Sequence, residues 1–82
     1  MYYVYLLRSK NSGKIYTGYT NNLRNRYKQH LEGKSFSTKS MGELELIFYE
    51  AFKSKKDALR REKYLKSTKG KRTVKIMLKY SL

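Results

Sequence analysis

The chain has 82 residues, no cysteine and one histidine, and its 20 lysines and arginines against six acidic residues give a net charge of +14. This composition excludes disulfide bridges and a zinc cluster, so the packing of tyrosine, phenylalanine and aliphatic side chains has to stabilise a small core. A field this positive favours polyanions, and we expect a nucleic acid as the partner.

A single domain is expected over residues 1–82, because a chain of this length rarely supports two hydrophobic cores. No stretch approaches the roughly 18 apolar residues of a membrane span, and no signal sequence opens the chain. We therefore expect a cytoplasmic protein that does not enter a membrane.

The N-terminal part of the chain predicts a β-hairpin. Residues 2–8, YYVYLLR, form a strand candidate with apolar side chains on both faces, which is typical of a central strand. The turn sequence SKNSGK separates it from a second strand, residues 14–20. If the turn is tight, with two or four residues, Tyr5 lies opposite Tyr16 or within one position of it. The two phenols then become cross-strand neighbours.

A helix over residues 23–32 follows, with Asn21 or Asn22 as its cap. At about 100° per residue, His30 falls within the apolar stripe of this helix. Arg26 precedes His30 by one turn, so the two side chains are neighbours. The apolar members of the stripe are Leu23, Tyr27 and Leu31.

The second half of the chain predicts one more strand and two helices. Residues 33–43 are rich in Ser, Thr, Gly and Lys and predict an exposed loop, and residues 44–52, LELIFYEAF, predict the third strand. A helix over roughly 55–67 follows, with a capping pattern that begins at Ser54. Residues 67–72, STKGKR, predict a basic turn, and a short helix is expected around Val74, Met77 and Leu78. The order β-β-α-β-α-α predicts an α+β fold with a small, largely antiparallel sheet flanked by helices.

Glu62 is expected on the inward face of the second helix, together with Ala58, Leu59 and Leu65. A carboxylate there has to be paired, coordinated or neutralised. With a single inward glutamate, metal chemistry would use one ion with one protein ligand, and water and phosphate would complete its shell. Structural alternatives stay open, because Glu62 can pair with the flanking Arg61 or Lys63, and His30 and the strand tyrosines can be ordinary core residues.

The combination of these positions resembles the GIY-YIG nuclease superfamily. Its first motif, Gly-Ile-Tyr, corresponds to residues 3–5, YVY, and its second, Tyr-Ile-Gly, to residues 16–18, YTG. Arg26 and His30 match an arginine and a histidine one turn apart on the next helix, and Glu62 matches a helical glutamate. Both triplets depart from the pattern, but the tyrosines and the second glycine are present. The chain is most similar to short stand-alone members related to the catalytic domain of the bacterial excision-repair endonuclease subunit.

The resemblance implies a three-stranded antiparallel sheet between helices and hydrolysis of DNA phosphodiester bonds by an activated water. Glu62 would hold one Mg²⁺ or Mn²⁺ ion, and Arg26 would bind the scissile phosphate. One of Tyr5 and Tyr16 would accept the proton of the water, with Tyr5 slightly favoured, while the other positions the water. Cations near the site would lower the pKa of the phenol. His30 would hydrogen-bond a tyrosine or the phosphate, or relay the proton.

Further expectations concern the substrate and its contacts. Gly18 would let the backbone turn from strand to helix and admit a phosphate. The predicted DNA contacts lie in loops: Lys34, Lys39, Lys69, Lys71 and Arg72. The expected enzyme is a structure-selective endonuclease for branched or single-stranded DNA in repair or recombination, with room for a protein partner that supplies specificity. The alternatives are a non-catalytic nucleic-acid binding module with the same fold and a structural ribosomal or membrane-surface protein.

Overall fold

A computed structural model describes the backbone of residues 1–82 and every side chain except those of residues 36 and 37. Its elements are β1 (Tyr2–Ser9), β2 (Ile15–Thr20), α1 (Leu23–Leu31), the 3₁₀ helix η1 (Phe36–Met41), β3 (Leu44–Phe52), α2 (Lys55–Lys66) and α3 (Thr68–Met77). The strands form one sheet, so the predicted α+β class and element order are confirmed. Within the described chain, no helix has the length and apolar character needed to cross a membrane.

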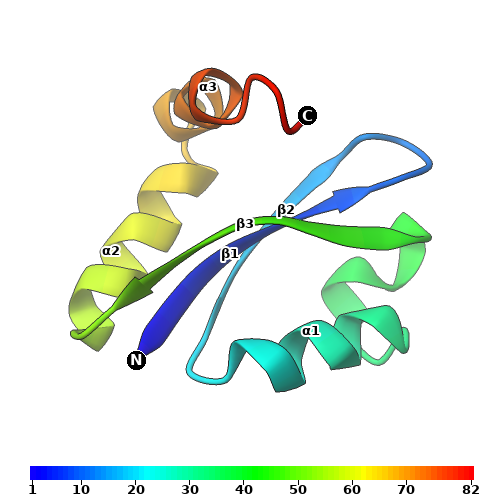
Figure 1. The fold of residues 1–82 in the computed structure, drawn as a ribbon, viewed down its shortest axis with the longest axis horizontal. Coiled ribbons are helices and arrows are strands. Elements are labelled where there is room, and N and C mark those ends of the chain that lie inside the picture. The colour runs from blue at the N-terminus through cyan, green and yellow to red at the C-terminus, as the bar shows by residue number, and fades with distance from the viewer.

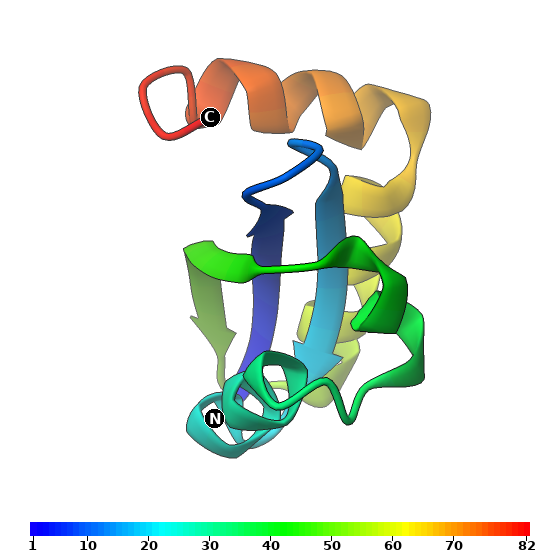
Figure 2. The same cartoon turned by 90° about the vertical axis from the view of Figure 1, so that its right-hand side faces the viewer.

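The sheet has the order β2-β1-β3, and both neighbours of β1 run antiparallel to it. Figure 2 shows β1 between the other two strands. In Figure 1, α1 lies on one side of the sheet and α2 and α3 lie on the other. Val4 and Leu6 pack toward α2 and α3, whereas Tyr5 and Leu7 pack toward α1. This burial on both sides explains why β1 is apolar throughout.

The register of the hairpin differs from the tight turn that the sequence predicted. Arg8 pairs with Ile15, so Tyr5 lies opposite Gly18 rather than within one position of Tyr16. The longer connection is closed by the amide of Ser9, which donates to the carbonyl of Lys14 at 2.9 Å. Tyr5 and Tyr16 are therefore diagonal neighbours, and they still point to the same face because side chains alternate along a strand.

Helix α1 begins where the sequence predicted. The side chain of Asn22 accepts a hydrogen bond from the amide of Asn25 at 3.1 Å and caps the first turn. Leu31, however, is 55% exposed and not part of the core. Its neighbour His30 points into the core, and Leu31 points away because adjacent residues of a helix lie about 100° apart around its axis.

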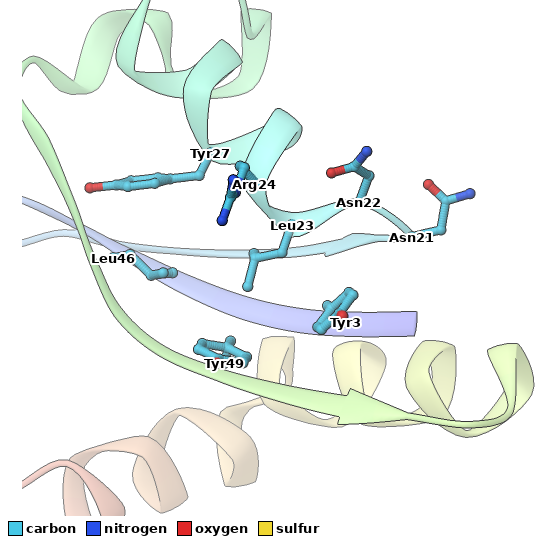
Figure 3. A pocket seen from close by; sticks show the side chains of 8 residues that line it. All are labelled: Tyr3, Asn21, Asn22, Leu23, Arg24, Tyr27, Leu46 and Tyr49. Atoms are coloured by element: carbon cyan, nitrogen blue, oxygen red, sulfur yellow. The ribbon is translucent and has the colours of Figure 1, made fainter. Parts of the chain in front are cut away.

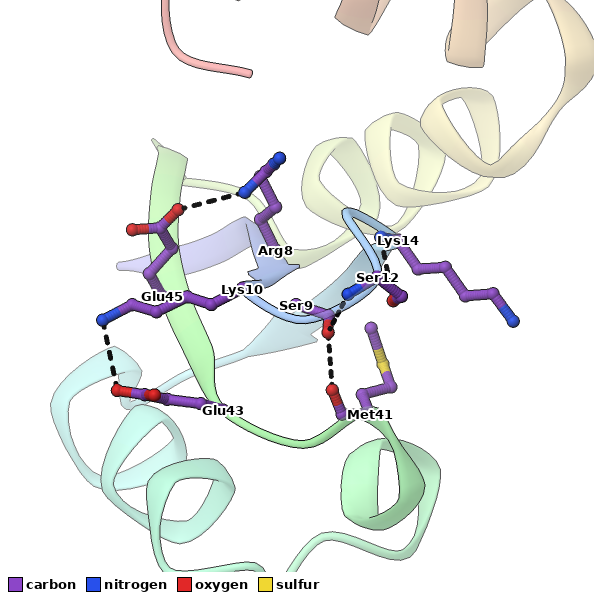
Figure 4. A network of polar contacts seen from close by, with 8 residues as sticks. All are labelled: Arg8, Ser9, Lys10, Ser12, Lys14, Met41, Glu43 and Glu45. Carbon is purple, nitrogen blue, oxygen red and sulfur yellow. Dashed lines mark hydrogen bonds and ion pairs between the residues drawn. The ribbon is translucent and has the colours of Figure 1, made fainter.

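The predicted exposed loop over residues 33–43 is wrong. Most of this segment forms η1, and the side chains of Ser35 and Thr38 are buried. Figure 4 shows how the end of η1 is attached to the hairpin, where the hydroxyl of Ser9 donates to the carbonyl of Met41 at 2.6 Å. Next to this contact, Lys10 forms an ion pair with Glu43 at 3.3 Å. These contacts hold η1 against the sheet face that carries Tyr5.

The two C-terminal helices cover the opposite face. Helix α2 has nearly the predicted bounds, but the side chain of Ser54 makes no capping hydrogen bond, and Leu59 is exposed rather than inward. The predicted basic turn is also wrong, because α3 already begins at Thr68. The hydroxyl of Ser67 accepts from the amide of Gly70 at 3.1 Å and caps α3. The turn between the two helices is therefore confined to Ser67.

Candidate active site

Three buried polar side chains form a chain of hydrogen bonds beneath α1. The hydroxyl of Tyr5 lies 2.8 Å from Nε2 of His30, and Nδ1 of His30 lies 2.7 Å from the hydroxyl of Thr38. All three side chains are at most 3% exposed. A neutral imidazole donates from one nitrogen and accepts at the other, so this chain satisfies both. His30 is therefore held in one orientation by a partner on each side.

Gly18 makes room for this arrangement. It lies inside β2, opposite Tyr5, and a methyl group at this position would overlap the Tyr5 phenol. The expectation that Gly18 forms the turn from strand to helix is wrong, because β2 continues to Thr20 and the turn lies at the following residues. The glycine is needed for its missing side chain rather than for its backbone freedom.

Tyr16 packs against the same pair of rings. Its ring centroid lies 6.2 Å from that of Tyr5 and 5.3 Å from that of His30. Unlike Tyr5, Tyr16 is only half-buried, and it also lines a surface groove. The two phenols of the motif tyrosines are thus neighbours, with one inside the core and the other at its edge.

Arg26 lies beside this cluster on α1. Its guanidinium donates to the side-chain oxygen of Gln29 at 3.0 Å and to the hydroxyl of Ser35 at 3.3 Å. Among the described side chains, no carboxylate forms an ion pair with it. The positive charge of Arg26 is therefore available to an anion that enters the site.

The buried side chains of Tyr5 and His30 are both neutral at physiological pH. Burial raises the pKa of the Tyr5 phenol to about 12, although the nearby Arg26 guanidinium acts in the opposite direction. Arg26 thus lowers the pKa of the Tyr5 phenol as expected, but burial is the larger effect, and the net shift is upward. Burial and the positive charge of Arg26 both lower the pKa of His30, which favours the neutral imidazole.

Glu62 lies on α2, in the layer on the other side of the sheet. Its carboxylate forms an ion pair with Lys66 at 3.1 Å, and its side chain is 20% exposed. The flanking Arg61 instead binds Glu50 at 2.7 Å. Among the described residues, no hydrogen bond or ion pair joins Glu62 to the cluster around His30.

The surroundings of Glu62 fit a single divalent ion with one protein ligand. Within the described part of the chain, no three His, Cys, Asp or Glu side chains gather as a metal site would require. The side chain of Glu62 is nevertheless partly exposed, at 20%, and its partner Lys66 is a flexible, half-exposed side chain that can move aside. Mg²⁺ commonly binds to one or two carboxylates and keeps several waters.

A basic groove of about 710 Å³ links the two regions. It runs between β2, the end of α2 and α3, and both Tyr16 and Lys66, the partner of Glu62, line it. The cations along it are Arg8, Lys14, Lys66, Lys71 and Lys75. The apolar residues that line it are Ile15, Leu65, Val74 and Leu82. No acidic side chain is among its described lining residues, so the groove suits a polyanion.

Most of the predicted DNA contacts lie in helices rather than in loops. Lys39 lies on η1 and not in a loop, and three further cations, Lys69, Lys71 and Arg72, belong to α3. Lys34 is in a connection and pairs with Glu32 at 3.2 Å. Only Lys71 of this set lines the groove.

Sequence reasoning missed several residues of the site. They are Ser35, Thr38, Arg8, Lys14, Lys66 and Lys75. The position of Lys66 four residues after Glu62 was a usable signal. Thr38 carried no such signal, because a Ser- and Thr-rich segment gives no pattern from which an inward direction can be read.

A family model described as the GIY-YIG catalytic domain matches residues 1–75, which include every residue of the hydrogen-bonded cluster. The chain belongs to the GIY-YIG family. This catalytic domain is a nuclease fold, so membership supports a phosphodiester hydrolase in general terms. GIY-YIG nucleases generally use divalent metal ions, and a nuclease domain implies a nucleic acid as substrate.

The relatives of this GIY-YIG chain include short UPF0213 proteins. It is 42% identical to one from Clostridium perfringens over 67 residues, which cover 80% of this chain and 71% of the relative. It is 38% identical to YazA of Bacillus subtilis over 72 residues, with 87% and 72% of the two chains covered. The solution NMR structure of a UPF0213 protein from Bacillus halodurans matches with a TM-score of 0.58 and 37% identity, over 94% of this chain and 85% of that one.

Proposed function

We propose that this GIY-YIG protein is a metal-dependent endonuclease that cuts branched or single-stranded DNA. One observation carries the proposal: Tyr16 belongs both to the phenol and imidazole cluster and to the lining of the basic groove. A strand that follows the lysines of the groove therefore passes Tyr16, whose ring packs against those of His30 and Tyr5. The buried imidazole of His30 has a hydroxyl partner at each nitrogen, so it is held in one orientation next to Tyr16.

The lysines of the groove and Arg26 bind different phosphates of the strand in this proposal. The lysines of the groove neutralise the phosphates along the strand, and each neutralised phosphate releases counterions. Arg26 receives the scissile phosphate, because its planar guanidinium can donate two parallel hydrogen bonds to phosphate oxygens. Ser35 and Gln29, which accept from Arg26, hold the guanidinium in position.

The two tyrosines have different roles in this proposal. Tyr16, as its phenolate, takes the proton of the attacking water, because it is half-buried whereas Tyr5 is fully buried. Tyr5 positions the site through His30, since it is buried and its pKa of about 12 keeps it protonated at physiological pH, so it does not accept the proton. This assignment reverses the slight preference for Tyr5 that the sequence alone supported.

Glu62 is the residue that would hold the divalent ion, Mg²⁺ or Mn²⁺, with water completing its shell. When bound, the ion would supply positive charge that offsets the negative charge developing on the phosphate oxygens. For Glu62 to bind it, the ion pair with Lys66 opens, and the ammonium of Lys66 turns to the phosphates of the groove.

The shape of the groove favours unpaired DNA. Its lining combines cations with aliphatic side chains, and a nucleobase freed from pairing can cover the aliphatic side chains, whereas a duplex presents mainly phosphates. Substrates of this kind arise in DNA repair and recombination, and we propose that the protein acts in one of these processes. A protein partner that directs it to such sites is compatible with the short chain.

The test is a cleavage panel with purified protein. Single strands, duplexes, flaps and Holliday junctions are incubated with Mg²⁺, with Mn²⁺ or with a chelator, and binding is measured in parallel. We expect cutting of flaps, junctions or single strands that requires the metal. Salt-sensitive binding without cutting of any substrate would instead identify a binding module, and robust cutting in the chelator would contradict the proposed mechanism.

A further inference from the structure

A second cavity, of about 470 Å³, lies between the start of α1 and the strands β1 and β3. Figure 3 shows the side chains that line it, with Arg24 and Tyr27 on the helix side and Tyr3 and Tyr49 on the strand side. The remaining lining residues are Asn21, Asn22, Leu23 and Leu46. None of the roles assigned so far to the GIY-YIG site uses this cavity.

The lining of the cavity has the chemistry of a nucleobase site. The rings of Tyr3 and Tyr49 meet edge to face, with their centroids 6.2 Å apart. Tyr49 is 53% exposed, so the pair offers aromatic surface to solvent rather than to the core. Leucines on both sides extend this surface, which is the kind of surface on which a flat, unpaired base stacks.

The rim of the cavity supplies polar groups that suit a nucleotide. Asn21 and Asn22 lie at the start of α1 and are exposed. The oxygen of Asn22 caps the helix, so the amide of Asn21 and the NH₂ group of Asn22 are the groups that can contact the edge of a base. Arg24 extends toward the strands in Figure 3 and forms no ion pair or hydrogen bond with any described side chain. No carboxylate is among the described lining residues, so a phosphate meets no repulsion there.

The position of the cavity relates it to the catalytic cluster. Tyr3 lies two residues before Tyr5 on β1 and on the same face, and Tyr49 is the register partner of Tyr5 on β3. The cavity and the phenols therefore share one face of the sheet, and they are about 7 Å apart along β1.

We propose that this cavity binds one unpaired nucleobase of the DNA strand that is cut, close to the scissile phosphate. The base stacks on Tyr49 and Tyr3, Asn21 or Asn22 contacts its edge, and Arg24 binds a phosphate of the same strand. This inference rests on the proposed nuclease function and adds a specific subsite to it. It also gives a reason for selecting unpaired DNA, because a base in a duplex cannot enter the cavity.

The inference is tested with a set of single-stranded oligonucleotides that carry one abasic position, moved stepwise along both sides of the cleavage site. Single-turnover rates and affinities are measured for the wild type, Tyr49→Ala and Tyr49→Leu. Tyr80→Ala serves as the matched control, because Tyr80 is 92% exposed and remote in sequence from the cavity. Thermal unfolding checks that the Tyr49 variants are folded.

We expect one abasic position that weakens binding or slows cutting by the wild type and Tyr80→Ala by about 5- to 150-fold, the range for one stacked base. Both Tyr49 variants should be insensitive to that position. Equal sensitivity in all four proteins, or no sensitive position in any, would overturn the subsite. If no DNA is cut, the proposed function fails, and the affinities alone then decide whether the subsite exists.

Discussion

His30 is the only histidine of the chain, and its environment explains why it can serve a site without being exposed. Tyr5 and Thr38 occupy its two ring nitrogens at 2.8 and 2.7 Å, and burial lowers its pKa. Protonation would add a second donor to a ring whose partners are matched to a neutral imidazole, next to the positive charge of Arg26.

This arrangement predicts a loss of stability in mild acid. Because the pKa of His30 is lower in the folded protein than the ordinary 6.5, the unfolded state binds the extra proton first. The free energy of unfolding should therefore fall as the pH decreases from about 7 to 5, by up to about 1.4 kcal/mol per pH unit. Urea unfolding at several pH values measures this slope. His30→Gln should lower the stability at pH 7 and flatten the slope, and an unchanged slope in this variant would contradict the account.

The two motif tyrosines should separate in their effects on catalysis and stability. We expect Tyr16→Phe to slow cutting by about 100-fold or more, the usual contribution of a proton-transfer group. Tyr5→Phe should slow cutting less but cost about 1–3 kcal/mol of stability, because His30 loses a buried partner. Single-turnover kinetics and urea unfolding of both variants decide this. Full activity of Tyr16→Phe with an inactive, stable Tyr5→Phe would reverse the assignment.

At the residue level, motif spacing and a polar residue on an apolar stripe predicted that Tyr5, Tyr16 and His30 belong together. These signals are local, and the structure packs the three rings against one another. The sequence could not identify Thr38, which reaches His30 only because η1 folds back under α1. The sequence also predicted the wrong role for Gly18, a turn from strand to helix instead of room for the Tyr5 phenol. Gly18 must lack a side chain because the strand register places it opposite Tyr5. That register is set by the turn of the hairpin, whose length could not be predicted from its residue types.

The strands and α1 could be predicted because their signals are local, whereas the start of α3 depends on contact with another element. Residues 67–72 contain a glycine between lysines, which predicts a turn when they are considered alone. In the structure, Gly70 lies inside α3 and against the last turns of α2, where a methyl group would overlap the carbonyl of Tyr64 and the backbone of Leu65. The glycine permits close packing of two helices and does not end one.

Gly70→Ala should therefore destabilise the protein, although alanine is the better helix former by about 1 kcal/mol. The overlap with the backbone of α2 cannot be relieved by a side-chain rotation, and overpacking of this kind typically costs about 1–3 kcal/mol. Urea or thermal unfolding measures the difference. Lys69→Ala, at an exposed neighbouring position of the same helix, is the control and should change little. A Gly70→Ala protein more stable than the wild type would show that α2 and α3 are not in close contact there.

For the whole molecule, the net charge of +14 predicted a polyanion as partner but not where it binds. The location depends on tertiary structure, because the hairpin turn, α2 and α3 each contribute cations to the groove beside β2. The location of Glu62 also depends on tertiary structure, although its match to the motif could be seen in the sequence. Its position in the layer opposite α1, with Lys66 between it and the groove, required the fold.

The central claim is that Glu62 and the cluster around Tyr16 act on one DNA strand in this groove. The most direct measurement is the single-turnover cutting rate of Glu62→Gln with Mg²⁺ on the best substrate of the panel, beside its DNA affinity. Glu43→Gln is the control, because Glu43 is an exposed acid that pairs with Lys10 outside the groove. We predict that Glu62→Gln cuts at least about 100-fold more slowly while it binds DNA as the control does. A Glu62→Gln protein that cuts as fast as the control would contradict the account.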